Sequence, residues 1–480
     1  DAAPRGATWL PDDTIVFATT SATTGLQRVA AAGGTPTVLT RPDRGQGELN
    51  HWLPEVLPGG RSVLFTITAR TGGIDAARIA VLDLQTTTHK VLVRGGSGAH
   101  YAATGHLLYG AAGTVRAIAF DLARLETRGT PVPAVPDVLT TSSGAVDAVA
   151  ATNGVLAYVS GGSGSVQRIL VWVDRQGQET SIPVPPRPYM YPRISPDGGR
   201  IALIAQDQET DIWLWDMERT TLTRATFEPG FDIYPVWTPD GRRLIFSSDR
   251  AGGGRNLFWQ AADTTGTVER LSESDSMQDP TAGSPHGTRL IFQEITAANG
   301  FDLMELHLDN GGSIGSSPAQ QRSARRVTPL VQTPFAELNG VVSPDGRWLA
   351  YETNDSGQFE IYVRPYPEVS RSLQQVSTGG GTRPLWARSG QELFYLSRAG
   401  ALMRVGLERG PTWTAGAPTK LLNEGYFTVL GGNPGRTYDI SPDGQRFLMI
   451  KAGGSGQAAA PQIVVVQNWH EELKRLVPTR

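Results

Sequence analysis

Two neighbouring stretches of the chain, 191–226 and 234–272, repeat one pattern of apolar and polar residues. In each, a short apolar run leads into a Pro-Asp-Gly turn, SPDG at 195–198 and TPDG at 238–241. An apolar run leaves the turn, and two further runs rich in β-branched and aromatic residues follow. Short apolar or alternating runs separated by turn residues are typical of β-strands. The pattern therefore predicts four strands per copy, the unit of a β-propeller blade.

Ten turns of this kind can be aligned along the chain, and their spacing is regular. The aligned positions are Asp12, Gly59, Thr104, Asn153, Asp197, Asp240, His286, Asp345, Ser389 and Asp443. The nine intervals average about 48 residues, close to the period of propeller repeats. Asp-Gly and Asn-Gly suit tight turns that need a positive φ, and the preceding proline fixes its own φ. We therefore expect these aspartates to shape the backbone and not to act as catalytic groups or metal ligands.

The repeats fall into two sets, which predicts two domains in an all-β fold. Repeats one to four, within residues 1–176, have degraded turns, whereas repeats five to ten, within 177–480, carry the sharper Pro-Asp-Gly form. The proline cluster at 182–192, IPVPPRPYMYP, suits a linker or an entry strand. We expect about ten four-stranded repeats, six of them forming a C-terminal six-bladed ring. The four N-terminal repeats are then an incomplete propeller or are continuous with the second ring.

The C-terminal end of the chain predicts how the second ring closes. After a strand at 463–467, the sequence NWHEELKRL has apolar residues at helical spacing over 469–476. Asn468 and Glu471 have the spacing of a capping box. A short helix here would leave the last blade one strand short. The segment 179–184 is the candidate for the missing strand.

Composition and charge exclude several classes of protein. The chain has 43 basic and 46 acidic residues and a net charge of −3, which argues against a general nucleic-acid binder. No run of 18 apolar residues occurs, so no membrane span is expected within this chain. The absence of cysteine excludes disulfides and thiolate chemistry but leaves the compartment open. Because the sequence starts at an aspartate, we expect a processed or truncated piece.

The motifs that carry chemistry do not fit an enzyme. Residues 311–315 match the G-x-S-x-G nucleophile pattern, but they lie in the Gly/Ser-rich stretch 310–323, which we expect to be a mobile loop of an all-β array. Phosphate-binding loops, kinase signatures and HExxH are absent. The seven histidines are scattered, with no two at ligand spacing on one regular element. We therefore predict no catalytic residue, no metal site and no cofactor.

The axial opening of the propeller is the remaining candidate for a binding site. The loops that lead into the innermost strands of the blades converge there, and propellers often bind peptides or small ligands at that place. In this chain those loops hold Glu48, Asn50, His51, Arg193, Asp232, Tyr234, Asp279, Asn339, Arg383, Arg436 and Tyr438. These mixed charges, amides and phenols suit a peptide, a protein or a small polar ligand. The alternative is that they satisfy strand ends and line a wet channel.

The repeats resemble those of a known family. The SPDG and TPDG turns, with third strands such as DIWLWD and EIYVR, are similar to the TolB-like, WD40-like repeats of bacterial propellers. This resemblance covers the whole chain and is most pronounced over 187–480. It implies the fold and says little about function.

A closer resemblance comes from RGATWLPDDTIVFATT, LTRPDRGQGELNHWLPEVLPGGRSVLFT and the C-terminal VVVQNWHEELKRL. Together they look like the propeller region that follows the kinase domain of bacterial eukaryotic-like serine/threonine kinases. In that family further repeats usually precede the segment that resembles RGATW. The kinase domain is not in this chain, so no kinase activity carries over. The resemblance implies a sensory or protein-interaction region outside the cytoplasmic membrane, periplasmic or at the cell surface.

Three alternatives remain beside a non-catalytic binding or sensor propeller. One is the propeller of an enzyme, such as a peptidase whose hydrolase domain follows the repeats. Another is a lyase that uses His51, Arg193, Arg383 and a metal at the axis, although no cluster of carboxylates and histidines supports it. The third is a structural protein that associates with itself through blade edges or faces.

Overall fold

A computed structural model of the chain describes most of its residues and divides it into two compact units. The described residues are 4–19, 24–69, 73–111, 113–136, 138–141, 144–151, 153–160, 167–206, 210–228, 231–251, 254–296, 300–308, 325–407, 414–429, 432–453 and 462–478. The six-sheet unit is Val166–Gly453, and the four-sheet unit combines Ala2–Ser165 with Gly454–Arg480. The stretch 310–323 with its G-x-S-x-G pattern lies outside the described residues.

The six-sheet unit contains five antiparallel four-stranded sheets whose strands follow one another along the chain. Their strands are β17 (Tyr189–Ile194), β18 (Arg200–Gln206), β19 (Thr210–Asp216) and β20 (Thr221–Arg224); β21 (Asp232–Trp237), β22 (Arg243–Ser248), β23 (Asn256–Ala261) and β24 (Glu269–Arg270); β25 (Gln278–Gly283), β26 (Arg289–Thr296), β27 (Gly300–His307) and β28 (Val327–Val331); β29 (Glu337–Val342), β30 (Trp348–Thr353), β31 (Glu360–Pro365) and β32 (Gln374–Gln375); β33 (Gly381–Trp386), β34 (Glu392–Ser397), β35 (Leu402–Gly406) and β36 (Thr419–Leu422). The first strand of each sheet is called its inner strand.

A sixth sheet is built from two distant parts of the chain. Its order is β16-β15-β38-β37, with β37 (Asp439–Ile440) and β38 (Arg446–Ala452) from the end of the unit and β15 (Arg168–Asp174) and β16 (Glu179–Ser181) from its start. The segment expected to supply a missing strand therefore does so, as the edge strand β16. The sequence placed β15 in the first domain, and this is wrong, because β15 pairs with β38 along its whole length.

Apolar side chains between the sheets close the six-sheet unit into a ring. Each of the five consecutive sheets shares a buried hydrophobic cluster with the next one. The sixth sheet shares one cluster with the fifth, in which the rings of Phe447 and Phe394 lie 5.0 Å apart, and another with the first, which includes Trp172 and Ile201. Every sheet is thus covered on both faces, as the near-continuous apolar runs of the middle strands predict. The predicted all-β fold of repeated antiparallel sheets is confirmed.

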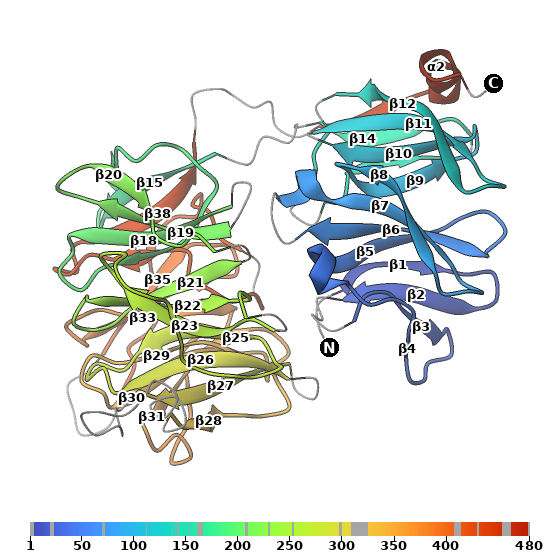
Figure 1. Cartoon of the computed structure of the whole chain (residues 1–480). Coiled ribbons are helices and arrows are strands. Elements are labelled where there is room, and N and C mark those ends of the chain that lie inside the picture. The colour runs from blue at the N-terminus through green and yellow to red at the C-terminus, as the bar shows by residue number, and fades with distance from the viewer. Residues whose placement is uncertain are drawn as a thin grey trace. The chain divides into compact units, whose positions relative to one another are not determined.

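The four-sheet unit contains four sheets in series (Figure 1). Its elements are β1 (Pro4–Trp9), β2 (Thr14–Thr19), β3 (Gln27–Ala30) and β4 (Thr37–Val38); β5 (Glu48–Val56), β6 (Ser62–Ala69), the 3₁₀ turn η2 (Gly73–Ala76), β7 (Arg78–Asp83) and β8 (His89–Arg94); β9 (Ser97–Ala102), β10 (His106–Ala111), β11 (Thr114–Asp121) and β12 (Glu126–Val135); β13 (Ala148–Ala150), β14 (Leu156–Val159) and β39 (Ile463–Val466). Three clusters join each sheet to the next. No cluster of the described residues joins the fourth sheet to the first, so this series is an open arc.

The C-terminal segment belongs to the four-sheet unit, and this corrects the predicted boundary between 176 and 177. Strand β39 pairs with β14, and the helix α2 (Trp469–Leu476) buries Trp469 and Leu473 in the cluster of the fourth sheet. The predicted short helix is confirmed, but its capping box is wrong. Asn468 adopts a left-handed φ of 57°, not the extended backbone of a capping residue, and its side chain makes no cap; the amide of Trp469 donates to the carbonyl of Gly154. Among the described residues, α2 is the only α-helix, and no helix is long and apolar enough to cross a membrane.

The aspartates of the repeated turns shape the backbone, as expected. At Asp197, one carboxylate oxygen accepts the hydroxyl of Ser195 at 2.5 Å and the amide of Gly199 at 3.0 Å. Asp345 and Asp443 make the same two bonds in later repeats. These hydrogen bonds hold the pKa of Asp197 below its usual value. Local contacts therefore stabilise the turn, and the guanidinium of Arg388 adds hydrogen bonds to the carbonyls of Ser195 and Pro196.

Candidate functional site

A left-handed bulge interrupts four of the five inner strands β17, β21, β25, β29 and β33. The third residue of each of these strands has a φ between 52° and 58°, and the pairing with the next strand shifts there. The four residues are Tyr191, Tyr234, Asn339 and Arg383. Residues other than glycine rarely adopt this conformation, and it costs about 1–3 kcal/mol, so such positions point to a constraint from tertiary structure. A bulge also re-aims the side chain that it carries.

The four bulge side chains meet around Gly435, in the loop that leads into β37. Its amide donates to Oδ1 of Asn339 at 2.9 Å, and its carbonyl accepts Nε of Arg383 at 3.0 Å. A Cβ at Gly435 would lie 2.6 Å from the ring of Tyr191 and 2.7 Å from the ring of Tyr234. The two phenol rings lie 4.7 Å apart. The point where the inner strands converge is therefore filled by the chain's own backbone.

Arginine and carboxylate side chains support the same region from beside it. Arg193 donates to the carbonyl oxygens of Pro192 and Arg436, both at 2.8 Å, and Asp439 accepts the guanidinium of Arg436 at 3.2 Å. Burial, with the neighbouring Arg436, lowers the pKa of Arg193 to about 9. The phenol of Tyr438 donates to the carbonyl of Arg383 at 2.9 Å. Arg193, Arg436 and Tyr438, all predicted as ligand-binding residues, therefore donate to backbone carbonyls of the chain itself.

Two further predicted residues form buried ion pairs. Asp279 is 1% exposed and accepts the guanidinium of Arg255 at 3.1 Å and the hydroxyl of Ser247 at 2.9 Å. Asp232 pairs with Arg250 at 2.7 Å, and burial raises the pKa of its carboxyl. Both arginines lie between β22 and β23. Arg250 thus ties that loop to the inner strand of its own sheet, and Arg255 ties it to the inner strand of the next sheet. They neutralise charges that an axial ligand could otherwise have used.

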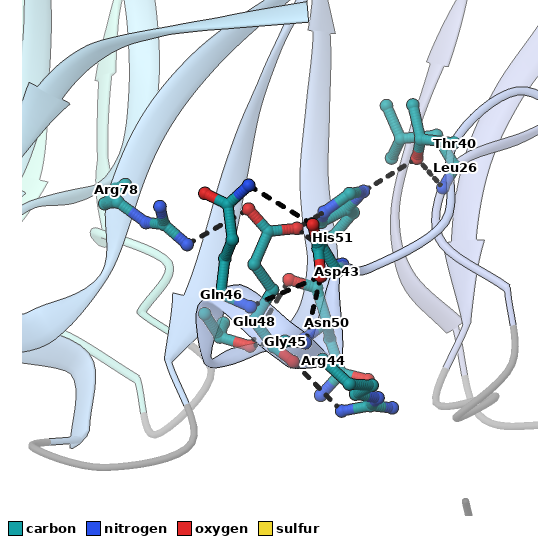
Figure 2. A network of polar contacts seen from close by, with 11 residues as sticks. Leu26, Thr40, Asp43, Arg44, Gly45, Gln46, Glu48, Asn50, His51 and Arg78 are labelled. Atoms are coloured by element: carbon teal, nitrogen blue, oxygen red, sulfur yellow. Dashed lines mark hydrogen bonds and ion pairs between the residues drawn. The ribbon is translucent and has the colours of Figure 1, made fainter.

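The predicted residues of the four-sheet unit belong to a separate polar network, drawn in Figure 2. Nε2 of His51 lies 3.0 Å from Oε2 of Glu48, and Nδ1 of His51 lies 2.8 Å from Oγ1 of Thr40. Arg78 pairs with the other oxygen of Glu48 at 3.0 Å. Burial opposes ionisation of Glu48, but hydrogen bonds from His51 and the amide of Asp43 lower its pKa to about 2. Asn50 is also buried, and its backbone amide donates to the hydroxyl of Thr68 at 3.0 Å.

An acid, a histidine and a hydroxyl in series are also the parts of a nucleophilic triad. Here the hydroxyl of Thr40 is buried and accepts the amide of Leu26 at 2.8 Å. A Cβ at Gly25 would lie 2.5 Å from the same Oγ1, which leaves no room for a substrate carbonyl. The network therefore ties strands together and does not supply a nucleophile.

The same contact, a backbone amide donating to a buried Ser or Thr hydroxyl, recurs in the six-sheet unit, which supports a structural role for Thr40. Thr226 accepts the amide of Ile212 at 3.0 Å, and Ser377 accepts the amide of Ile361 at 2.8 Å. In both, the hydroxyl follows the fourth strand and accepts a backbone amide near the start of the third strand, β19 or β31. The sequence analysis missed this hydrogen bond, although a Ser or Thr at the end of four of the repeats (VLT, RAT, RLS, QVS) is its signal. Among the described residues, no group of three metal-ligating side chains comes together.

The structure brings six of the eleven predicted residues to Gly435 or to its neighbours; they include Arg436, which follows Gly435 in the chain, and Arg193, which binds the carbonyl of Arg436. Tyr234, Asn339 and Arg383 surround Gly435, and Tyr438 binds the backbone of Arg383. Glu48, Asn50 and His51 lie in the other unit. Sequence reasoning missed Tyr191 and Gly435.

It also missed three exposed aromatic residues in the loops between a fourth strand and the next inner strand: Phe227, Phe231 and Phe335. Because each of these loops leads into an inner strand, they lie at the end of the ring where inner strands begin. Phe227 is 66% exposed. Exposed aromatic side chains flanked by polar groups are typical of protein-interaction surfaces.

Comparison with known proteins agrees with the propeller fold. The family model described as "TolB beta propeller domain" matches residues 147–329. Among curated relatives, the Tol-Pal system protein TolB of Wolinella succinogenes is 30% identical over 116 residues, which are 24% of this chain and 27% of that protein. An uncharacterized peptidase, YuxL of Bacillus subtilis, is 24% identical over 208 residues, which are 36% of this chain and 31% of that protein. The repeats within residues 147–329 are similar to those of TolB propeller domains.

The matched regions cover less than one third of each of these two relatives. Among solved structures, putative TolB from Agrobacterium tumefaciens is similar, with a TM-score of 0.45 and 16% identity over 61% of this chain and 100% of that chain.

Proposed function

We propose that this chain is a non-catalytic propeller region that binds a protein or an extended peptide, at the end of the six-sheet unit where the inner strands begin. The observation that carries the proposal is the way this unit holds Gly435. Side chains from two inner strands bind both the amide and the carbonyl of that residue, and two tyrosine rings enclose it. The inner strands at this end therefore hold peptide backbone by their side chains, here the backbone of the chain itself.

The rim around this point offers apolar anchors for a partner. Phe227, Phe231 and Phe335 are exposed on loops at this end. Aromatic residues contribute most of the binding energy in many interfaces, because they bury large areas with few rotatable bonds. Since the chain's own segment fills the point of convergence, a small polar ligand would have to displace it. A peptide or protein that binds across the rim does not.

The resemblance to TolB-like propellers and to kinase-associated propellers supports a sensory or protein-interaction role outside the cytoplasmic membrane. Such a role needs a binding surface and no catalytic group. The buried, paired state of the predicted axial residues is compatible with it, because these residues hold the rim in place.

Selection of a displayed library of random 12-residue peptides on the full chain tests the proposal. We expect enriched peptides whose affinity, measured by fluorescence anisotropy, falls at least about tenfold in a Phe227→Ser, Phe231→Ser, Phe335→Ser triple variant, since each anchor contributes on the order of 1 kcal/mol. Leu373→Ser is the matched control: Leu373 is an exposed apolar residue between a third and a fourth strand, at the opposite end. Enriched peptides that bind the triple variant as tightly as the wild type would overturn the proposed surface.

The similarity to YuxL favours a second candidate, the propeller of a peptidase. In that case the chain would limit access to a hydrolase domain and would not be a sensor. Labelling of the full natural protein by a fluorophosphonate probe distinguishes the two, because only a serine hydrolase reacts.

A further inference from the structure

One end of the four-sheet arc has an apolar face with none of the described residues of its own unit against it. In the sheet β1–β4, cross-strand pairing places Ala7 beside Phe17 and Trp9 beside Ile15. Ile15 in turn pairs with Val29, and Gln27 with Val38. Face A is defined as Ala7, Trp9, Ile15, Phe17, Gln27, Val29 and Val38. Trp9 is 58% exposed and the other members are exposed or half-buried, whereas Val16 and Ala18 on the opposite face are fully buried against the second sheet.

The other end of the arc has a second face of the same kind. In the sheet β13-β14-β39, Val149 pairs with Ala157, Ala157 with Val465, and Val159 with Ile463. Face B is defined as these five residues. Ile463 is 78% exposed, Val149 62% and Val465 59%, while the alternating residues of the same strands pack against the third sheet and α2. Neither face carries a charged side chain.

The sequence of both end sheets is that of strands covered on two faces. TIVFAT in β2 and IVVV in β39 are continuous apolar runs, not the alternating runs of a sheet with one face in water. Every sheet of the six-sheet unit, and both middle sheets of the arc, are covered on two faces by neighbouring sheets. Exposed β-branched and aromatic residues in register across several strands therefore mark faces A and B as unfinished sheet-on-sheet interfaces.

We propose that face A of one copy packs on face B of a second copy, in both directions, so that two four-sheet arcs close one ring of eight sheets. Three observations favour a second copy. Both faces occur on the same unit, at its opposite ends, so a second copy brings the matching face to each. Face A has two large aromatic side chains, Trp9 and Phe17, and face B has none, so the aromatic rings of face A would meet aliphatic side chains. Eight sheets lie within the usual range of propellers, and a two-fold axis leaves no face exposed.

Light scattering coupled to size exclusion tests this with the full chain. We expect a mass of twice the 51.4 kDa of one chain at tens of micromolar protein. Trp9→Glu and Ile463→Lys each place a charge in both interfaces of their own dimer, which weakens association by about a hundredfold or more. Each alone should run as a monomer. Mixing the two should restore a dimer, because one interface is then wild type and the other pairs Glu with Lys.

The mixing result separates this arrangement from others. Packing of face A on another face A predicts that Ile463→Lys alone still dimerises, and would overturn the proposal. A monomeric wild type, a ladder of larger species, or a mixture that stays monomeric would overturn it too. Leu373→Glu, an exposed apolar position in the six-sheet unit, is the control that should leave the dimer intact. Since Trp9 and Ile463 are exposed in one copy, circular dichroism of the variants should match the wild type.

Discussion

Glu337 gives the sharpest test of the buried polar groups of the ring. It is 1% exposed, on the inner strand β29, with its carboxylate bound by the hydroxyl and the amide of Thr333. Burial, with the nearby Asp302, raises its pKa from 4.5 to about 7 despite these hydrogen bonds. The folded state therefore binds this proton more tightly than the unfolded state. At about 1.4 kcal/mol per tenfold change in proton affinity, ionisation of Glu337 costs about 3 kcal/mol of stability.

The sign of the pH dependence follows from the raised pKa. The stability contributed by the protonated group is fully present below pH 4.5, falls as the pH rises, and is lost above about pH 7. Glu337→Gln keeps the shape of the side chain and cannot ionise. We expect this variant to match the wild type near pH 5 and to be more stable by about 2–3 kcal/mol at pH 8.

Urea unfolding followed by tryptophan fluorescence at pH 5, 6, 7 and 8 measures the difference. Glu392→Gln is the matched control, because hydrogen bonds from Arg175 lower the pKa of Glu392. Its stabilising charge is present above pH 4.5, so this variant should be destabilised by a constant amount from pH 5.5 to 8. If the difference between the wild type and Glu337→Gln does not change between pH 5 and 8, the reasoning on Glu337 is wrong.

Two further substitutions test the contacts described above. Gly435→Ala should lower the free energy of unfolding of the ring by about 3 kcal/mol, because the residue has a positive φ and the new Cβ would lie 2.6 Å from the ring of Tyr191. Gly357→Ala is the control: Gly357 also has a positive φ but has open space around it, so the change should cost only about 1–2 kcal/mol. Urea unfolding measures both. Thr40→Val should lower the free energy of unfolding by about 1–3 kcal/mol, because it leaves the backbone amide of Leu26 without its acceptor. Hydrogen exchange at that amide should become faster, and slower exchange than in the wild type would contradict the reasoning.

The repeats could be predicted from the sequence because their turns depend on local contacts. Asp197 binds the hydroxyl two residues before it and the amide two residues after it, so the motif carries its own structure. The assignment of β15 failed for the opposite reason. Its apolar run fits any sheet, and only its pairing with β38, far along the chain, decides which one it joins. Local patterns carry no information about such a partner.

The candidate site could be predicted only in part, for the same physical reason. Tyr234, Asn339 and Arg383 could be found because they lie upstream of recognisable turns, on strands that must converge. That Gly435 fills the point of convergence follows from the packing of four inner strands around one loop, and no spacing in the sequence shows it. The exposed Phe227 and Phe335 lie in loops whose sequences vary between repeats.

The pairing of β14 with β39 sets the order in which the chain can complete its two units during synthesis. Ser160 and Gln462, 302 residues apart, hydrogen-bond in the same sheet as neighbours. All strands of the six-sheet unit precede Gly453, so that ring can close before the C-terminal segment leaves the ribosome. The arc begins first and finishes last, since its fourth sheet waits for the final strand. A released chain that ends at Gly453 would therefore contain every strand of the ring and an arc that lacks β39 and α2.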